Sequence, residues 1–119
     1  MSTRAVYQFF SPATKDTVLF YKHHDGYPQG PGGALARIQS VLNLAQYVHL
    51  ETVRKVMLAI GAEELKDQNE ADTSDQQHRY NVTLDYGSVS LVHYDWHEET
   101  KDHLVLTADG WKKRWMADV

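Results

Sequence analysis

Apolar and polar positions follow two periods along the chain, that of a strand at both ends and that of a helix in the middle. Segments 5–10 and 17–22 are rich in Val, Phe and Tyr, and the Pro and Asp between them predict a hairpin loop. Residues 80–86 alternate strictly between apolar and polar, which predicts a half-buried strand. Further strands are expected at residues 88–96, 103–107 and 111–116.

The middle of the chain has the helical period. Apolar residues recur at three- and four-residue spacing from about Gly33 to His49, and a similar pattern runs from Val53 to Ile60, followed by Gly61. The apolar stripe slips between these two runs. We therefore expect two helices with a tight join, or one bent helix, packed by their apolar stripes against the core.

Residues 63–77 are polar and acidic and show no sustained period. They predict a solvated surface loop rather than a domain boundary, because neither side is long enough to stand as a full domain. The order of elements predicts a single α+β domain over residues 1–119. Its mostly antiparallel sheet combines an N-terminal hairpin with a C-terminal meander, and the two-helix segment packs on one face.

Composition narrows the classes of function. The 119 residues contain no cysteine, which excludes disulfides, thiolate metal sites and a cysteine nucleophile. No apolar run approaches the roughly 18–20 residues that cross a bilayer, so we expect no membrane partner and a cytoplasmic protein. The formal charge of −4 argues against a nucleic-acid partner, because proteins that bind nucleic acid rely on Lys and Arg to neutralise its phosphates.

One basic cluster stands against this balance. Lys112, Lys113 and Arg114 lie between Trp111 and Trp115. Basic residues interleaved with aromatic ones can bind single-stranded nucleic acid through charge and base stacking. Three charges fall far short of a basic face. We therefore expect the tryptophans to dock on the core while the charges stay in water.

The loop between the second strand and the first helix is the most informative stretch. Residues 21–33 hold four of the seven glycines and two of the three prolines. Functional residues concentrate on loops held by a rigid scaffold, so we expect a binding site here. Its candidate residues are His23, His24, Asp25, Gly26 and Tyr27.

The same loop opens onto a helix, whose first amides and dipole attract anions. Lys22, with the two histidines that follow it, could then grip a phosphate or a carboxylate. The alternative is that glycine and proline merely redirect the chain from strand to helix.

A second histidine group is His93-x-Asp95-x-His97. On an extended strand these three side chains share one face, and zinc accepts both residue types as ligands. The spacing has no family specificity, and polar residues on one strand face are usually solvated. We therefore expect no metal here.

Patterns typical of catalysis are weak. The glycine-rich run lacks the spacing of a phosphate-binding or dinucleotide-binding loop, and no serine stands in a Gly-x-Ser-x-Gly elbow. We expect no cofactor. The sequence does not decide whether the protein is an enzyme, and it favours a binding protein.

Residues 1–35 resemble a group of small bacterial and phage-encoded proteins. The shared features are the start Met1-Ser2-Thr3-Arg4 and a loop of the form Tyr-x-His-x-Asp-Gly-Tyr-Pro, here residues 21–28. The resemblance carries over no catalytic residue. It implies a context among accessory genes of phages and mobile elements, and it marks residues 24–28 as the shared feature.

This resemblance predicts a non-catalytic binding protein that inhibits a bacterial defence system such as CRISPR. Such proteins occupy a surface of the host machinery or sequester a signalling nucleotide. The acidic segments 63–75 and 98–102 would suit a basic surface on a host protein or complex. The alternative is a ligand binder or enzyme that takes a phosphorylated or nucleotide substrate through His23, His24 and Asp25.

The N-terminal strands also predict a homodimer. They carry aromatic side chains on both faces, and a chain of this size has only two helical segments to cover them. We expect apolar strand surface to stay exposed at Tyr7, Phe9 or Tyr21 until a partner covers it.

Overall fold

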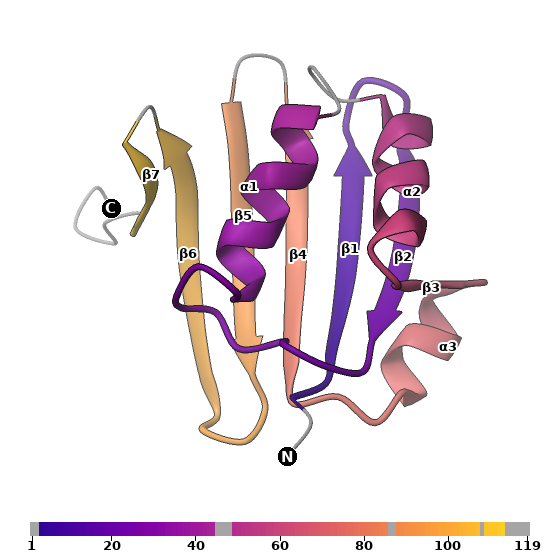
Figure 1. Cartoon of the computed structure of the whole chain (residues 1–119). Helices are drawn as coiled ribbons and strands as arrows, with labels where there is room; N and C mark the ends of the chain where they lie inside the picture. The colour runs from indigo at the N-terminus through magenta and orange to yellow at the C-terminus, as the bar shows by residue number, and fades with distance from the viewer. Residues whose placement is uncertain (1–2, 45–48, 86–87, 108, 114–119) are drawn as a thin grey trace.

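Seven strands of the described chain form one continuous sheet in the order β3-β2-β1-β4-β5-β6-β7 (Figure 1). The computed structural model describes residues 3–44, 49–85, 88–107 and 109–113. The elements are β1 Ala5–Ser11, β2 Asp16–Lys22, α1 Ala34–Leu44, α2 Leu50–Ala59, β3 Glu63–Leu65, α3 Gln68–Thr73, β4 His78–Asp85, β5 Ser88–Asp95, β6 Thr100–Thr107 and β7 Gly110–Lys113.

The strand pairing confirms an α+β fold with a mostly antiparallel sheet. Every neighbouring pair is antiparallel except β1 and β4, which run parallel in the interior of the sheet. The expected hairpin of β1 and β2 forms, as does the meander of β4 to β7. The parallel pair joins these two halves of the chain.

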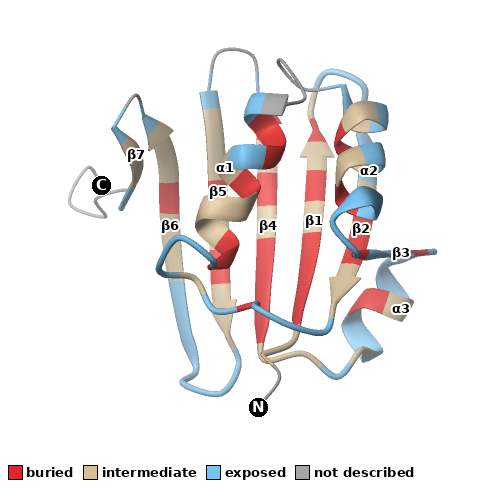
Figure 2. Ribbon diagram, viewed as in Figure 1, coloured by how far each residue is buried: buried red, intermediate tan, exposed pale blue. Residues whose placement is uncertain are grey.

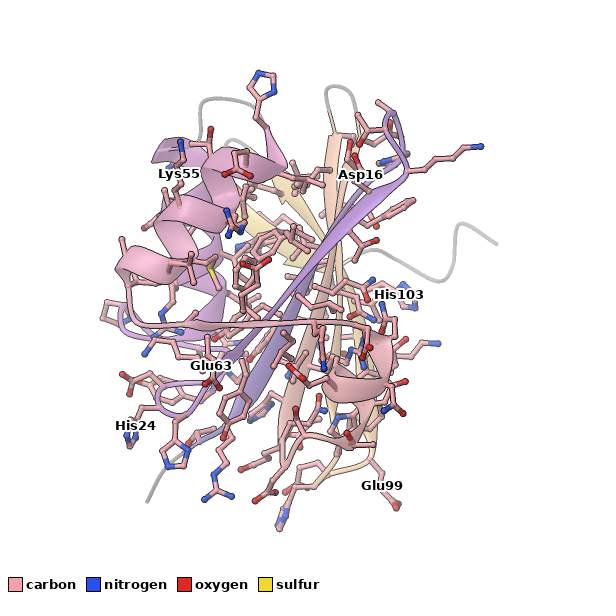
Figure 3. All side chains as sticks on the ribbon, turned by 90° about the vertical axis from the view of Figure 1, so that its right-hand side faces the viewer. Asp16, His24, Lys55, Glu63, Glu99 and His103 are labelled. Atoms are coloured by element: carbon pink, nitrogen blue, oxygen red, sulfur yellow. The ribbon has the colours of Figure 1, made fainter. Side chains whose placement is uncertain are left out.

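Helices cover the two faces of the sheet unequally. α1 and α2 lie side by side on one face, α1 in front of β4 and β5 and α2 in front of β1 and β2 (Figure 1). Figure 3, turned by 90°, shows α3 on the opposite side of the sheet from α2. There Ala71 of α3 packs with Val6, Leu19 and Leu65 in a small second core. No helix in the described residues is both long enough and apolar enough to span a membrane.

Segment 63–77, expected to be a loop, contains both β3 and α3. The carboxylate of Asp67 accepts a hydrogen bond from the Glu70 amide at 2.9 Å and thereby caps α3. The Glu70 carboxylate in turn accepts from the Lys66 amide at 3.2 Å. No apolar period could indicate this helix, because Ala71 is the single apolar residue among its six.

The main core lies between the sheet and the pair α1 and α2, where Figure 2 shows the buried residues gathered along β1 and β4. Tyr7 and Phe9 are fully buried there, so the expectation that they stay exposed was wrong. Their strand lies inside the sheet between β2 and β4, where helices cover it. Tyr21 is half-buried against the second core. The homodimer stays a prediction, but the exposed strand surface on which it was based is largely covered.

Candidate functional site

A row of side chains crosses five strands on the helix-covered face and changes from apolar to polar along its length. The strand registers place Phe20 beside Tyr7, Tyr7 beside Tyr80, Tyr80 beside His93, and His93 beside Asp102. Because side chains alternate between faces of a sheet, residues paired in register in this way share one face. The row therefore carries polar groups from the core out to β6.

The aromatic rings of this row stack closely. The rings of Tyr7 and Tyr80 are 5.3 Å apart between centroids, and those of Tyr80 and His93 are 4.7 Å apart and nearly parallel at 8°. His78, one position along β4 on the same face, stacks on His93 at 5.0 Å. Such contacts stabilise the fold beyond the burial of apolar surface, and they fix the planes of the rings. We call Tyr7, Tyr80, His93 and His78 the ring stack.

Two buried histidines are bonded to each other within the ring stack. His78 Nδ1 lies 2.8 Å from His93 Nε2, and Asp95 Oδ2 lies 3.8 Å from the same His78 nitrogen. Burial lowers the pKa of both imidazoles, and the neighbouring His78 lowers the pKa of His93 further. Both rings are therefore neutral near pH 7, with one nitrogen donating its N–H to the other.

The glycine-rich loop is tied to the ring stack by side chains that the sequence did not single out. Arg37 of α1 donates to the Tyr7 hydroxyl at 2.9 Å and to the backbone carbonyls of Asp25 and Gly32 at 2.9 and 3.0 Å. The Tyr80 hydroxyl donates to the Gly26 carbonyl at 2.5 Å. Burial raises the pKa of both tyrosines, so both hydroxyls keep their protons.

Gly26 itself is held where no side chain fits. Its amide donates to the Thr3 carbonyl at 2.8 Å, and a Cβ at this position would lie 2.7 Å from both Ala5 Cβ and Thr3 O. Gly33 is equally tight, because a Cβ there would meet the Gln29 carbonyl. Glycine at position 26 therefore allows the loop to lie directly on β1, and glycine at position 33 allows the loop to turn closely on itself before α1.

This arrangement leaves a cavity of about 330 Å³ at the polar end of the row. The loop, the first turns of α1, and strands β5 to β7 surround it. Its polar groups come from His93, Asp102, Gln39 and Gln29. Its apolar wall is formed by Pro28, Leu35, Ala36, Leu104 and Trp111. We call this cavity the His93 pocket.

The wall of the His93 pocket is held in place from both sides. The Trp111 indole N–H donates to the Leu35 carbonyl at 2.9 Å, which joins β7 to α1. Asp102 is half-buried, and Lys113 Nζ lies 4.0 Å from its Oδ1. The carboxylate of Asp102 is thus available as a hydrogen-bond acceptor at the pocket.

The side chains proposed from the sequence lie outside this pocket. His23, His24, Asp25 and Tyr27 are exposed, and Figure 3 shows His24 pointing away from the sheet. His23 Nδ1 lies 3.0 Å from the hydroxyl of Tyr21. Of the predicted residues, Gly26 alone is buried. A partner for the exposed four stays a prediction.

The start of α1 is also occupied by the loop. The amides of Gly33, Ala34 and Leu35 donate to the carbonyls of Gly30, Tyr27 and Pro28 at 2.7 to 3.2 Å. These first amides are the groups that would hold an anion at a helix start. The loop therefore caps the helix with its own backbone.

The structure divides the trio His93, Asp95 and His97. His93 and Asp95 share the helix-covered face as alternation predicts, but His97 follows the end of β5 and is exposed in a turn. Its amide and that of Glu98 donate to Asp95 Oδ1 at 3.0 and 3.1 Å. Within the described ranges, no three His, Asp or Glu side chains are placed to hold a metal ion.

At the basic cluster, Trp111 docks on α1 while Lys112 and Lys113 are exposed, as expected. Arg114 and Trp115 lie outside the described residues. Comparisons with protein-family models, with curated proteins and with solved structures find no match. The argument for function therefore rests on the geometry of the His93 pocket.

Proposed function

We propose that the protein is a non-catalytic binding protein whose ligand is a small heteroaromatic molecule, such as a nucleoside or nucleotide, held in the His93 pocket. The observation that supports this is the juxtaposition of Asp102 and a buried His93 at one cavity with the Trp111 wall. Ligand sites are typically apolar clefts of about 300–1,000 Å³ with a few placed polar groups. The His93 pocket lies at the small end of that range.

The chemistry of the lining selects the ligand class. A heteroaromatic base has apolar faces, which suit Trp111, Leu35 and Leu104, and N–H groups on its edge, which suit the Asp102 carboxylate. Proteins that bind single bases use this combination of stacking and edge hydrogen bonds. Lys113 near Asp102 offers a charge at the side of the pocket where a phosphate would be accommodated.

His93 contributes as a neutral hydrogen-bonding group. Its lowered pKa keeps the ring uncharged near pH 7, and its bond to His78 fixes one ring nitrogen. The stack on Tyr80 fixes the ring plane. A ligand therefore meets a ring whose orientation is set before binding, which reduces the entropic cost of association.

Isothermal titration calorimetry with the four ribonucleosides and their 5′-monophosphates tests the proposal. We expect at least one to bind, and Asp102→Asn to weaken its binding roughly tenfold, because the hydrogen-bond acceptor loses its negative charge. Asp16→Asn is the matched control, since Asp16 is exposed at the start of β2 away from the pocket. It should bind as the wild type does.

Two results would overturn the proposal. One is the failure of all eight compounds to bind the folded wild-type protein. The other is equal affinity of the wild type and Asp102→Asn for a compound that does bind. A monophosphate that binds more tightly than its nucleoside would in addition assign the phosphate to the side of Lys113.

The phage context also remains a proposal, supported by the resemblance of residues 1–35. Capture of a signalling nucleotide is one of the two routes by which a defence inhibitor acts, and the His93 pocket has suitable chemistry for it. Occupation of a host protein surface is the other route. Binding of a nucleotide would favour the first.

A further inference from the structure

Two hollows flank Trp96 on the sheet face opposite the His93 pocket. One has a volume of about 350 Å³ and is lined by Arg4, Asp75, Gln76, Gln77, Trp96 and His97. The other, of about 540 Å³, lies between α3 and strands β4 and β5 and shares Gln76 and Trp96 with the first. We call the two hollows together the Trp96 groove.

An aromatic platform stands at the centre of the Trp96 groove. The indole of Trp96 stacks on the ring of Tyr94 at 5.0 Å with an angle of 19° between the planes. The ammonium of Lys101 lies 5.9 Å from the centre of the Tyr94 ring. Trp96 nevertheless remains 48% exposed, the most of any large hydrophobic residue in the described chain. Its free surface is available to stack on a ligand.

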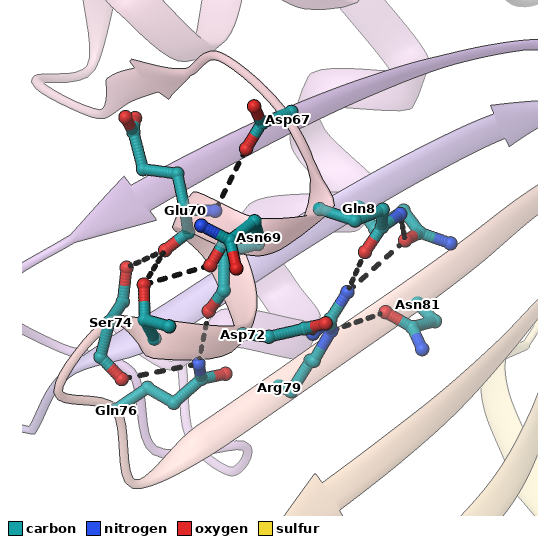
Figure 4. A network of polar contacts seen from close by, with 12 residues as sticks. Gln8, Asp67, Asn69, Glu70, Asp72, Ser74, Gln76, Arg79 and Asn81 are labelled. Carbon is teal, nitrogen blue, oxygen red and sulfur yellow. Dashed lines mark hydrogen bonds and ion pairs between the residues drawn. The ribbon is translucent and has the colours of Figure 1, made fainter.

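The charged groups of the Trp96 groove are already neutralised within the protein. Arg79, which is only 8% exposed, donates to Asp72 Oδ1 at 2.6 Å and to the side-chain oxygens of Gln8, Gln68 and Asn81 (Figure 4). At the other end of the groove, Arg4 pairs with Asp75. A phosphate or another anion would have to compete with these carboxylates.

Amide side chains supply the remaining polar surface. Gln76 lies between the hollows and donates to the Ala71 carbonyl at 2.6 Å, as drawn in Figure 4. Its Oε1 is buried and has no hydrogen-bond partner among the described residues, and the same holds for Arg4 Nε. The amide groups of Gln76 and Gln77 in the lining can each donate and accept, which favours a ligand that can do both.

We propose that the Trp96 groove binds a carbohydrate, in the form of a neutral oligosaccharide. A sugar ring has an apolar C–H face that stacks on an indole. Its hydroxyls donate to carboxylates and amide oxygens and accept from guanidinium and amide N–H groups. Both arginines that line the groove are paired with carboxylates, which leaves Lys101 beside Tyr94 as a single nearby cation, far fewer than a phosphate backbone needs. The inference does not depend on the ligand of the His93 pocket, which lies on the other face.

An array of neutral and N-acetylated oligosaccharides, followed by calorimetry on the best binder, tests the proposal. We expect Trp96→Ala to weaken binding about tenfold or more, the scale of one lost ring-stacking contact. Trp96→Phe keeps an aromatic face and should recover part of the affinity. Leu58→Ala is the control, because Leu58 is 41% exposed on α2, across the sheet from the groove.

The melting temperature of each variant shows that it is folded, which is expected because Trp96 is half-exposed. No binding of any oligosaccharide by the wild-type protein would overturn the proposal. So would unchanged affinity in Trp96→Ala. Binding of oligo(dT) through Trp96, without binding of any sugar, would assign the groove to single-stranded nucleic acid instead.

Discussion

His78 Nδ1 and His93 Nε2 lie 2.8 Å apart in the interior, so the two imidazoles share a single proton between them. If His78 donates, His93 Nε2 must accept, and Nδ1 of His93 then carries the only N–H of that ring. The tautomer that His93 presents is thus coupled to that of a residue behind it. Protonation of the accepting nitrogen would set two N–H groups against each other. Protonation of the donor ring on its outer nitrogen keeps the hydrogen bond but places a positive charge in the interior, and burial makes that charge costly.

Acidification should therefore destabilise the fold. The folded-state pKa of both histidines lies below the ordinary value of 6.5, so the unfolded chain binds more protons once the pH falls below that value. Stability should be full above about pH 7 and should decline toward about pH 5.5, before most carboxylates titrate. Thermal melts across this range measure the slope.

His93→Gln should show a shallower decline of melting temperature with falling pH than the wild type, even if its melting temperature is lower throughout. His24→Gln changes a histidine that is exposed on the loop and should keep the wild-type slope. A wild-type melting temperature that is constant from pH 7.5 to 5.5 would contradict the role of the buried pair.

Gly26→Ala should destabilise the protein by about 1–3 kcal/mol or more, because its Cβ overlaps Ala5 and Thr3. The cause is close approach rather than a left-handed backbone, since Gly26 is not one of the glycines with positive φ. Gly32→Ala is the matched control, with only the Tyr27 hydroxyl nearby at 3.2 Å. Urea unfolding of the two variants compares them directly, and equal stability would show that the loop does not rest on the sheet.

Arg37→Lys should release the loop while keeping the charge. A single ammonium cannot reach the Tyr7 hydroxyl and both loop carbonyls at once, and we expect a loss of about 1–3 kcal/mol. Amide exchange of the loop should accelerate. Arg54→Lys alters an exposed ion pair with Glu51 and Glu64 and should leave exchange in the loop unchanged.

Asp25→Asn distinguishes binding through the exposed loop side chains from binding in the His93 pocket. Asp25 is exposed with φ of 61°, and Asn adopts this left-handed conformation readily, so the free energy of unfolding should change by less than about 0.5 kcal/mol. Affinity for the pocket ligand should stay the same. A variant that melts normally but no longer binds would move the site back to the exposed loop residues.

Local pattern predicted most of the strands and helices but not how they meet. Alternation at residues 80–86 and the helical stripe from Gly33 gave β4 and α1 within a few residues, because both periods are properties of one segment. The parallel register that sets Tyr7 beside Tyr80 involves two segments far apart in sequence. No period within either segment contains that information.

The candidate site was missed for the same reason. His78 and His93 fall on neighbouring strands, and their contact depends on the register of β4 against β5. In the helical pattern Arg37 is a polar position on the outer side of the helix, although its guanidinium reaches back to the loop.

For α3 one local signal was available. Asp67 and Glu70 have the spacing of a capping box, which indicates the start of that helix.

The parallel pair β1 and β4 also sets the order in which the chain can fold. The two hairpin systems on either side form from contacts close in sequence, whereas Tyr7 and Tyr80 are separated by more than half the chain. Bringing these two residues together costs conformational entropy before any contact compensates for it. We therefore expect the pairing of β1 with β4 to form late in folding. The loop and α1 come from one half and β4 to β7 from the other, and the hydrogen bonds of Tyr80 to Gly26 and of Trp111 to Leu35 join them. A chain arrested before this docking step would hold both half-sheets yet have no cavity, so competence to bind arises together with the final cooperative transition.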